Sequence, residues 1–208
     1  MLSSADHCVI RGKRQGSLTH SKQGHASVGS RRILLVRHSE VADRYRNLCY
    51  GQSDVELSAS GISQSQALAR QLAAEPISEL YHSGLSRTQV LAEILADFAG
   101  ISIQECPLLR ERNFGAWELR PWDELYAETG DAMLGSIREP ETWRPPGGET
   151  TCEMRDRVLV WFRALPSSGV IVAVTHGGPI AALRGSLGGK PVAEWPMLIP
   201  ATGTVIEL

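Results

Sequence analysis

The chain has 208 residues, a length that suits one domain with a sizeable core and a short extension. Its 21 basic and 23 acidic side chains give a formal net charge of -2, which excludes attraction of nucleic acid or of an anionic membrane through overall charge. Any bound anion must therefore be held by a local cluster of donors. No apolar run approaches the roughly 18 residues that cross a bilayer.

Residues 1 to 30 differ from the rest of the chain because polar, basic and glycine residues dominate them. Such a composition buries little apolar surface, so we expect a disordered tail, or alternatively a start codon assigned too far upstream. The tail lacks the apolar segment of a signal peptide, and the irregular spacing of its histidines is typical of surface positions. The four cysteines have neither zinc-ligand spacing nor the density of a disulfide scaffold, so we expect a cytoplasmic protein.

From residue 31 onward, short apolar runs alternate with amphipathic segments. Gly100 suits the position just past a helix end, and Thr150 with Glu153 forms a capping-box pattern. The periodicity predicts, in chain order, strand 33–36, helix 60–75 ending at Pro76, strand 80–81, helix 86–98, strand 101–103, helix 121–129, a helix after Thr150, strand 170–175 and a helix near Pro179.

This alternation is typical of the α/β class. We expect a single domain over residues 31–208, with a mostly parallel central sheet and helices on both faces. The segment 108–148 is less regular, since it combines several prolines with three tryptophans. We expect it to form a lid-like insertion beside the sheet.

Two histidines directly follow predicted buried strands. His38 comes after strand 33–36 with only Arg37 between them, and His176 comes directly after strand 170–175. Ligands of open α/β sheets bind beyond the carboxyl ends of the strands, where both histidines are placed. A single histidine there would more often be an ordinary loop residue, but two at equivalent strand ends favour a functional site.

Charged side chains accompany these histidines. Arg37 presents a fork of donors that matches phosphate oxygens, and Arg87 stands at a strand-to-helix turn, where helix-end amides favour anions. Glu111 lies between Arg110 and Arg112. A solvated surface charge at Arg87 and a solvated ion pair at Glu111 are the alternatives. In a phosphate site, the Glu111 carboxyl group could instead protonate a leaving alkoxide.

Five motifs occur in order: Arg-His-Ser-Glu at 37–40, Ser-Gly-Leu-Ser-Arg at 83–87, Leu-Arg-Glu-Arg-Asn-Phe-Gly at 109–115, Pro-Pro-Gly-Gly-Glu at 145–149 and Thr-His-Gly-Gly at 175–178. In these motifs the chain resembles the histidine phosphatase (phosphoglycerate mutase-like) superfamily over residues 31–208. The resemblance implies a hydrolase that forms a phosphohistidine on His38 without a metal or cofactor. It also implies that Arg37, Arg87 and His176 hold the phosphoryl oxygens and that Glu111 exchanges protons with the leaving group and water.

Two positions depart from the family pattern. Ser39 replaces the usual glycine and tolerates fewer backbone conformations. Arg44 stands at the offset from the nucleophile where mutase members have asparagine, so it either adds positive charge at the substrate mouth or points to solvent. Both changes concern the substrate more than the reaction.

The stretch Cys-Tyr-Gly-Gln-Ser-Asp at 49–54 resembles a loop of alpha-ribazole phosphatases, which act in cobalamin assembly. Alpha-ribazole 5′-phosphate is therefore the leading expected substrate. The expected substrate-binding residues are Arg44, Tyr50, Gln52 and Arg112. The aromatic rings of Tyr50, Trp117 and Trp122 could stack on the base of that nucleotide, or could pack in the core or lid.

Three other functions stay open: a broad-specificity sugar-phosphate phosphatase, a phosphoglycerate mutase-like enzyme, and a silent phosphate-binding protein on the same fold. In each case the expected partner is a small phosphorylated metabolite, not nucleic acid or a membrane. The sequence is also compatible with a homodimer.

Overall fold

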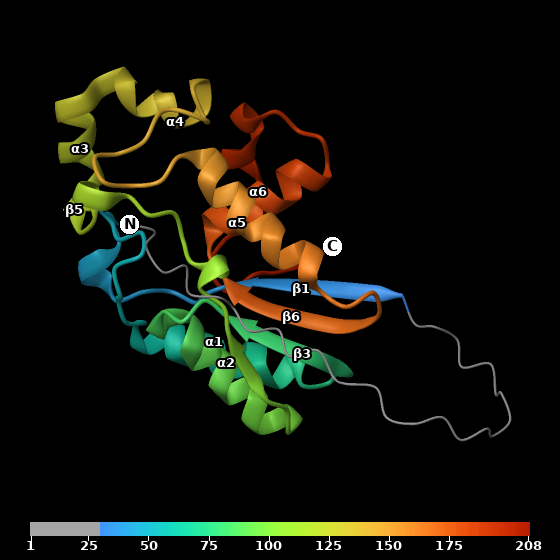
Figure 1. Ribbon diagram of the computed structural model, residues 1–208. Helices are drawn as coiled ribbons and strands as arrows, with labels where there is room; N and C mark the ends of the chain where they lie inside the picture. Colours follow the sequence, from blue (N-terminus) through green and yellow to red (C-terminus); the bar gives the residue numbers. More distant parts are fainter. Residues whose placement is uncertain (1–29) are drawn as a thin grey trace, which may run out of the picture.

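The computed structural model describes residues 30–208 and has a central five-stranded sheet with the order β4-β3-β6-β1-β7 (Figure 1). Its strands are β1 (Arg31–Arg37), β3 (Ile77–His82), β4 (Ile103–Glu105), β6 (Gly169–Thr175) and β7 (Val205–Glu207). The pairs β1–β6, β6–β3 and β3–β4 are parallel, and β7 runs antiparallel to β1. The expectation of a mostly parallel sheet is confirmed.

Helices cover both faces of this sheet, as expected (Figure 1). One face packs against α1 (Ala59–Leu72) and α2 (Ser86–Ala99), and the other packs against α5 (Thr151–Ala164) and α6 (Gly177–Leu187). Neighbouring residues of β1 separate accordingly, since Leu34 joins the first core and Leu35 the second. The buried run 33–36 therefore reflects a strand that is covered on both sides.

Several element boundaries follow the local signals in the sequence. Thr150 and Glu153 form the predicted capping box at the start of α5, and Gly100 ends α2 in the left-handed conformation with φ 64°. Helix α1 ends at Leu72, before the predicted boundary at 75, because Ala74 and Glu75 already form turn hydrogen bonds. Strand β4 begins at Ile103, two residues later than predicted.

The segment 108–148 forms a subdomain-like wall beyond the carboxyl ends of the sheet strands (Figure 1). It contains the short strand β5 (Arg120–Pro121), which pairs with β2 (Leu48–Cys49), and it packs around a small core of its own. Trp117 is only 6% exposed in that core, beside Cys49 and Leu125, so the structure favours its packing role over stacking on a ligand. Its elements, with β2, are β2 (Leu48–Cys49), β5 (Arg120–Pro121), α3 (Trp122–Thr129) and α4 (Gly135–Arg138), and short 3-10 turns connect them.

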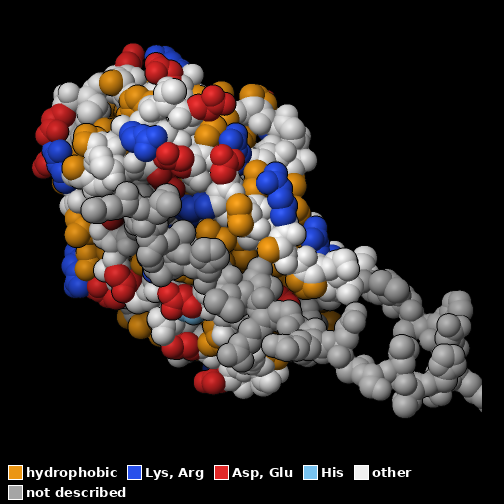
Figure 2. Space-filling view, viewed as in Figure 1, with side chains coloured by type: hydrophobic (Ala, Val, Ile, Leu, Met, Phe, Trp, Pro, Cys, Tyr) orange, Lys and Arg blue, Asp and Glu red, His pale blue; other side chains and the backbone are white. Residues whose placement is uncertain are grey.

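The expected disordered tail lies outside the described residues, apart from Ser30, and stays a prediction. Within residues 30–208, no helix is both long and apolar enough to cross a membrane. On the upper part of the face in Figure 2, acidic and basic side chains are interspersed.

Candidate active site

The pairing of β1 with β6 brings His38 and His176 together. The two strands are parallel and in register, with Arg37 opposite Thr175, so the residues that follow them are also neighbours. The His38 amide donates to the Thr175 carbonyl at 2.9 Å, and the two imidazole centroids are 5.2 Å apart. Both side chains are at most 1% exposed. The predicted convergence of these histidines at one sheet edge is therefore confirmed.

The ring of His38 has a defined tautomer. Its Nδ1 lies 2.8 Å from the Ser39 carbonyl oxygen, which can only accept, so Nδ1 carries the proton and Nε2 keeps its lone pair. Burial lowers the pKa of His38 to about 3, and the positive charges of Arg87 and Arg37 contribute in the same direction. A neutral imidazole with a free Nε2 lone pair is the form that attacks phosphorus.

Ser39 fits its position without backbone strain. It is fully buried and accepts a hydrogen bond from the Ser65 hydroxyl at 2.8 Å. Among the described residues, Leu119 is the only non-glycine residue with positive φ, so Ser39 does not adopt a conformation that would require glycine. The replacement of the family glycine therefore leaves the geometry next to His38 intact.

Two arginines place positive charge near His38, since the charges of both Arg87 and Arg37 act on its ring. Arg87 lies in the first turn of α2, is fully buried, and donates to the carbonyls of Gly51 at 2.6 Å and Ser53 at 2.9 Å. Arg37 donates to the Pro200 carbonyl at 2.6 Å. Neither arginine has a carboxylate within ion-pair distance among the described residues. Burial lowers the pKa of Arg87, but a guanidinium remains charged at physiological pH.

Three buried nitrogen atoms near His38 have no hydrogen-bond partner in the described part of the chain: Nε of Arg37 and Nε of Arg87, which are donors, and Nδ1 of His176, which is a donor in one of the two neutral tautomers. A buried donor without a partner costs about 1–3 kcal/mol, so folded proteins rarely retain several in one place. Here two of the three atoms belong to arginine side chains, and all three lie near His38. The arrangement suits the oxygens of a dianionic phosphoryl group.

Glu111 faces this cluster from the wall segment. Its carboxylate accepts from the amide of Arg112 at 2.9 Å and, more weakly, from the amide of Gly178 in the first turn of α6 at 3.3 Å. It lines the same cavity as Arg37 and Tyr50.

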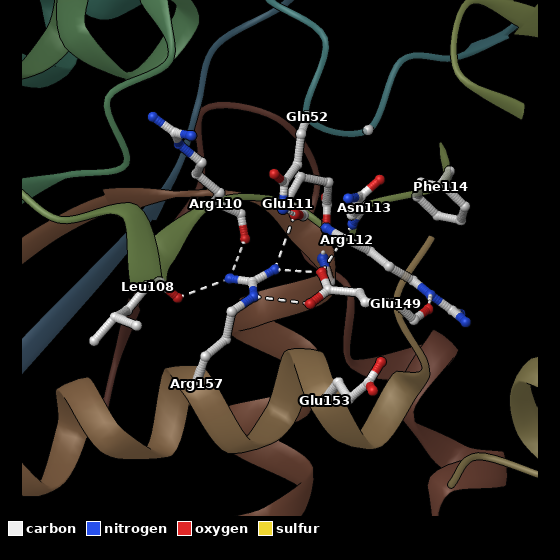
Figure 3. A network of polar contacts seen from close by, with 12 residues as sticks. Gln52, Leu108, Arg110, Glu111, Arg112, Asn113, Phe114, Glu149, Glu153 and Arg157 are labelled. Carbon is white, nitrogen blue, oxygen red and sulfur yellow. Dashed lines mark hydrogen bonds and ion pairs between the residues drawn. The ribbon is translucent and has the colours of Figure 1, made fainter. Parts of the chain in front are cut away.

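A polar network holds the loop that carries Glu111 (Figure 3). Arg157 of α5 donates to the carbonyls of Leu108 at 2.7 Å, Arg110 at 2.7 Å and Glu111 at 2.9 Å. It also pairs through two nitrogens with Glu149, at 3.0 and 2.7 Å, and both side chains are under 20% exposed. A bidentate pair with three further acceptors gives this loop one geometry.

A cavity with a volume of about 370 Å³ lies beside this cluster, and Arg37, Tyr50 and Glu111 line it. His38, His176 and Arg87 are not among its lining residues. The polar and charged lining residues are Arg37, Arg46, Tyr50, Glu111, Arg112, Ser136 and Thr151. The apolar and aromatic lining residues are Leu48, Phe114, Trp122, Ile137, Met154, Ala181, Val192, Trp195, Pro196 and Ile199.

The family model for the histidine phosphatase superfamily (branch 1) matches residues 33–208 of the chain. The chain belongs to the histidine phosphatase superfamily. This membership supports a phosphatase enzyme, and the fold described above agrees with it.

Named relatives of this histidine phosphatase differ in activity. A probable phosphoglycerate mutase of Yersinia enterocolitica is 33% identical over 162 residues, 76% of this chain and 75% of the relative. A glucosyl-3-phosphoglycerate phosphatase of Mycobacterium tuberculosis is 33% identical over 180 residues, 81% of this chain and 80% of the relative. The crystal structure of the alpha-ribazole phosphatase from Shigella flexneri aligns with a TM-score of 0.74 and 25% identity, covering 85% of this chain and 89% of that one.

The expected substrate-binding residues of this histidine phosphatase occupy different places. Tyr50 and Arg112 line the cavity. The Tyr50 ring centre lies 6.3 Å from that of His38 and 5.1 Å from the Arg87 guanidinium. Gln52 does not line the cavity and instead donates to the Glu111 carbonyl at 2.9 Å.

Arg44 is not among the cavity-lining residues and forms an exposed ion pair with Glu56. The structure thus favours the solvent-facing alternative for Arg44. Its neighbour Arg46 lines the cavity instead, with ion pairs to Glu40 at 3.0 Å and Asp43 at 2.7 Å. Arg44 lies within the 3-10 turn Asp43–Tyr45 and Arg46 directly follows it, so a residue offset alone does not define which way each side chain points.

Sequence reasoning missed other residues of the site. Met154 of α5 and Trp195 of the 3-10 helix Val192–Leu198 are far apart in the chain and meet only where both segments pack against α6, so no local motif marked them. The sequence offered only a weak indication for Arg157, which is a charged residue directly before Val158 of the apolar face of α5. Within the described residues, no group of three or more His, Cys, Asp or Glu side chains is placed to hold a metal ion.

Proposed function

We propose that this protein hydrolyses a phosphomonoester through a phosphohistidine on His38. The observation that carries this proposal is a set of three buried nitrogens without a hydrogen-bond partner among the described residues, from Arg37, Arg87 and His176, near a neutral imidazole. The two arginine donors are positioned before the reaction begins, so they stabilise developing charge without reorganisation. Membership of the superfamily supports the same chemistry.

The first step transfers the phosphoryl group. Nε2 of His38 forms a bond to phosphorus while the bond from phosphorus to the ester oxygen breaks. The arginines and His176 hold the phosphoryl oxygens, and a protonated Glu111 gives its proton to the departing alkoxide. The products of this step are a free alcohol, a phosphohistidine and an ionised Glu111.

The second step restores the enzyme. Glu111 takes a proton from water as the water oxygen attacks phosphorus, and the bond between phosphorus and Nε2 breaks. Inorganic phosphate leaves, His38 is again neutral, and Glu111 is again protonated for the next turnover. No step uses a metal, so we expect activity in the presence of a chelator.

For the substrate we propose alpha-ribazole 5′-phosphate, whose release of phosphate belongs to cobalamin biosynthesis. The aromatic side chains that line the cavity, Phe114, Trp122 and Trp195, suit a flat aromatic base. The similarity to the alpha-ribazole phosphatase of Shigella flexneri supports the same substrate. With this substrate the enzyme would act in the cytoplasm on a small metabolite.

Glucosyl-3-phosphoglycerate is a second candidate substrate, favoured by the Mycobacterium tuberculosis relative. Its sugar and carboxylate would need polar partners in the cavity. Arg112 offers an unpartnered Nη2, and Ser136 and Thr151 also line the cavity. Mutase activity, suggested by the Yersinia relative, is a third candidate and would return the phosphoryl group to an alcohol instead of water.

The test is phosphate release from alpha-ribazole 5′-phosphate, glucosyl-3-phosphoglycerate, 3-phosphoglycerate and p-nitrophenyl phosphate, with a chelator present. The His38→Ala variant is the control for the nucleophile. Chelator-resistant hydrolysis that depends on His38 supports the proposed reaction, and the order of kcat/KM values identifies the substrate. Conversion of 3-phosphoglycerate without phosphate release would identify a mutase, and binding without turnover would identify a silent relative.

A further inference from the structure

A chain of two hydroxyl groups connects His176 to the start of α2. The Nε2 atom of His176 lies 2.8 Å from the Ser83 hydroxyl, which lies 2.9 Å from the Thr88 hydroxyl. The Thr88 hydroxyl in turn lies 2.7 Å from the Leu85 carbonyl oxygen. His176, Ser83 and Thr88 are all fully buried, so solvent does not compete for these contacts.

The ring of His176 stays neutral before a ligand binds. Burial lowers its pKa well below the ordinary value, and the positive charges of Arg87, Arg157 and Arg37 and the neighbouring His38 oppose protonation further. A neutral imidazole has a single N–H group, on one nitrogen or the other. If His176 is to donate from Nδ1 to a phosphoryl oxygen, its Nε2 must therefore accept a hydrogen bond.

The hydroxyl chain permits two arrangements of its protons. In the first, Thr88 donates to Leu85, Ser83 donates to Thr88, and Nε2–H of His176 donates to Ser83. In the second, Thr88 donates to Ser83 and Ser83 donates to Nε2, which places the ring proton on Nδ1. The Leu85 carbonyl also accepts from the amides of Thr88 and Gln89, so it keeps partners in both arrangements.

We propose that Ser83 is a positioning residue, which donates its hydroxyl proton to Nε2 of His176 and thereby presents Nδ1–H to the transferred phosphoryl group. Nδ1 of His176 is buried and has no partner among the described residues. In this arrangement it becomes a hydrogen-bond donor to a phosphoryl oxygen. Thr88 completes the chain by reversing its own hydroxyl. The proposal rests on the proposed function in one respect, namely that His176 contacts the phosphoryl oxygens.

The test compares three variants by nitrogen NMR of the His176 ring, with inorganic phosphate as the probe. Ser83→Ala removes the donor to Nε2. Thr88→Val removes the alternative acceptor for the Ser83 proton and keeps the side-chain shape. Ser78→Ala is the matched control, because Ser78 lies on β3, the strand that ends directly before Ser83, and its hydroxyl donates to the Val170 carbonyl at 2.9 Å instead of contacting His176.

In the phosphate complex of the unchanged protein and of Ser78→Ala, we expect a protonated Nδ1 and an unprotonated Nε2. Thr88→Val should show this tautomer even before phosphate is added. Ser83→Ala should lose it and should lower kcat/KM by about 10- to 100-fold, a loss no larger than that for removing an oxyanion donor itself. A protonated Nε2 in the phosphate complex, or an unchanged tautomer and rate in Ser83→Ala, would overturn the proposal.

The same experiment separates this proposal from the proposed function. If the unchanged protein binds phosphate with the expected tautomer but hydrolyses no ester, the proposed hydrolysis fails and the role of Ser83 in positioning His176 is retained. If hydrolysis proceeds through His38 while the tautomer is the opposite one, only the role of Ser83 fails.

Discussion

The guanidinium of Arg87 donates to the Gly51 carbonyl at 2.6 Å, although the two residues are 36 positions apart. The loop that contains Gly51 is held in turn by Glu118, whose carboxylate accepts from the Gln52 amide at 2.9 Å and the Ser53 hydroxyl at 2.6 Å. The wall segment thus fixes the loop that orients Arg87. The site depends on this arrangement as much as on the strand ends that carry the histidines.

Replacement of Arg87 by methionine should abolish most phosphate binding. The variant loses a buried cation while methionine keeps an unbranched apolar stem in its place, so we expect kcat/KM to fall by about 100-fold or more. Inorganic phosphate should raise the Tm of the unchanged protein, because it binds only the folded state, and should have little effect on the Tm of Arg87→Met. Equal phosphate-induced shifts in both proteins would show that Arg87 does not hold the anion.

Acid should destabilise the fold through His38. Its pKa is about 3 in the folded protein against an ordinary value of 6.5, so between these pH values the unfolded chain binds more protons. The free energy of unfolding therefore falls as pH is lowered from 6.5 toward 3, and His38→Gln should show a shallower fall. Denaturant titrations at several pH values measure the difference, and parallel curves for the two proteins would contradict the depressed pKa.

Glu111→Gln should affect poor leaving groups most. An alkyl phosphate needs a proton on its leaving oxygen, whereas p-nitrophenolate leaves without one. We expect kcat to fall by about 100- to 10,000-fold for the alkyl ester and much less for p-nitrophenyl phosphate. Steady-state rates on both esters measure this, and equal losses on both would argue that Glu111 has no role as the acid.

Arg157→Met should disturb the loop that carries Glu111 without touching substrate. The change leaves Glu149 buried without its partner, so we expect a loss of about 3 kcal/mol in the free energy of unfolding together with a lower kcat. Arg155→Met is the matched control on the same helix, since the pair of Arg155 with Asp156 is more exposed and contributes little. Thermal melts and steady-state kinetics of both variants measure these effects. Equal losses in Arg157→Met and Arg155→Met would rule out a specific role for the network in Figure 3.

Trp195→Ala should discriminate between substrates. The indole lines the cavity, so its loss should lower kcat/KM for alpha-ribazole 5′-phosphate by about 10-fold or more and leave p-nitrophenyl phosphate less affected. Tyr126→Ala is a suitable control, because Tyr126 is 58% exposed and does not line the cavity. An equal loss on both esters would indicate that Trp195 supports the fold rather than the base.

The sequence predicted the parts of the site that local signals define. Buried strands next to His38 and His176 placed both residues at one sheet edge, because parallel neighbours end together. Strand β7 was not predicted, because its three residues are too few to form a clear apolar run. Tertiary packing decides which way Arg44 and Arg46 point and brings Trp195 to the cavity wall. Hydrophobic periodicity along the chain does not encode these positions.

The most direct test of the proposed chemistry is detection of the phosphoenzyme. A rapid reaction of the enzyme with excess phosphomonoester, stopped in alkali and followed by peptide mass spectrometry, should show one phosphate on the peptide that contains His38. That phosphate should be stable in alkali, labile in acid and absent from His38→Ala. Steady turnover with no phosphorylated His38 peptide, or full turnover by His38→Ala, would contradict a phosphohistidine intermediate.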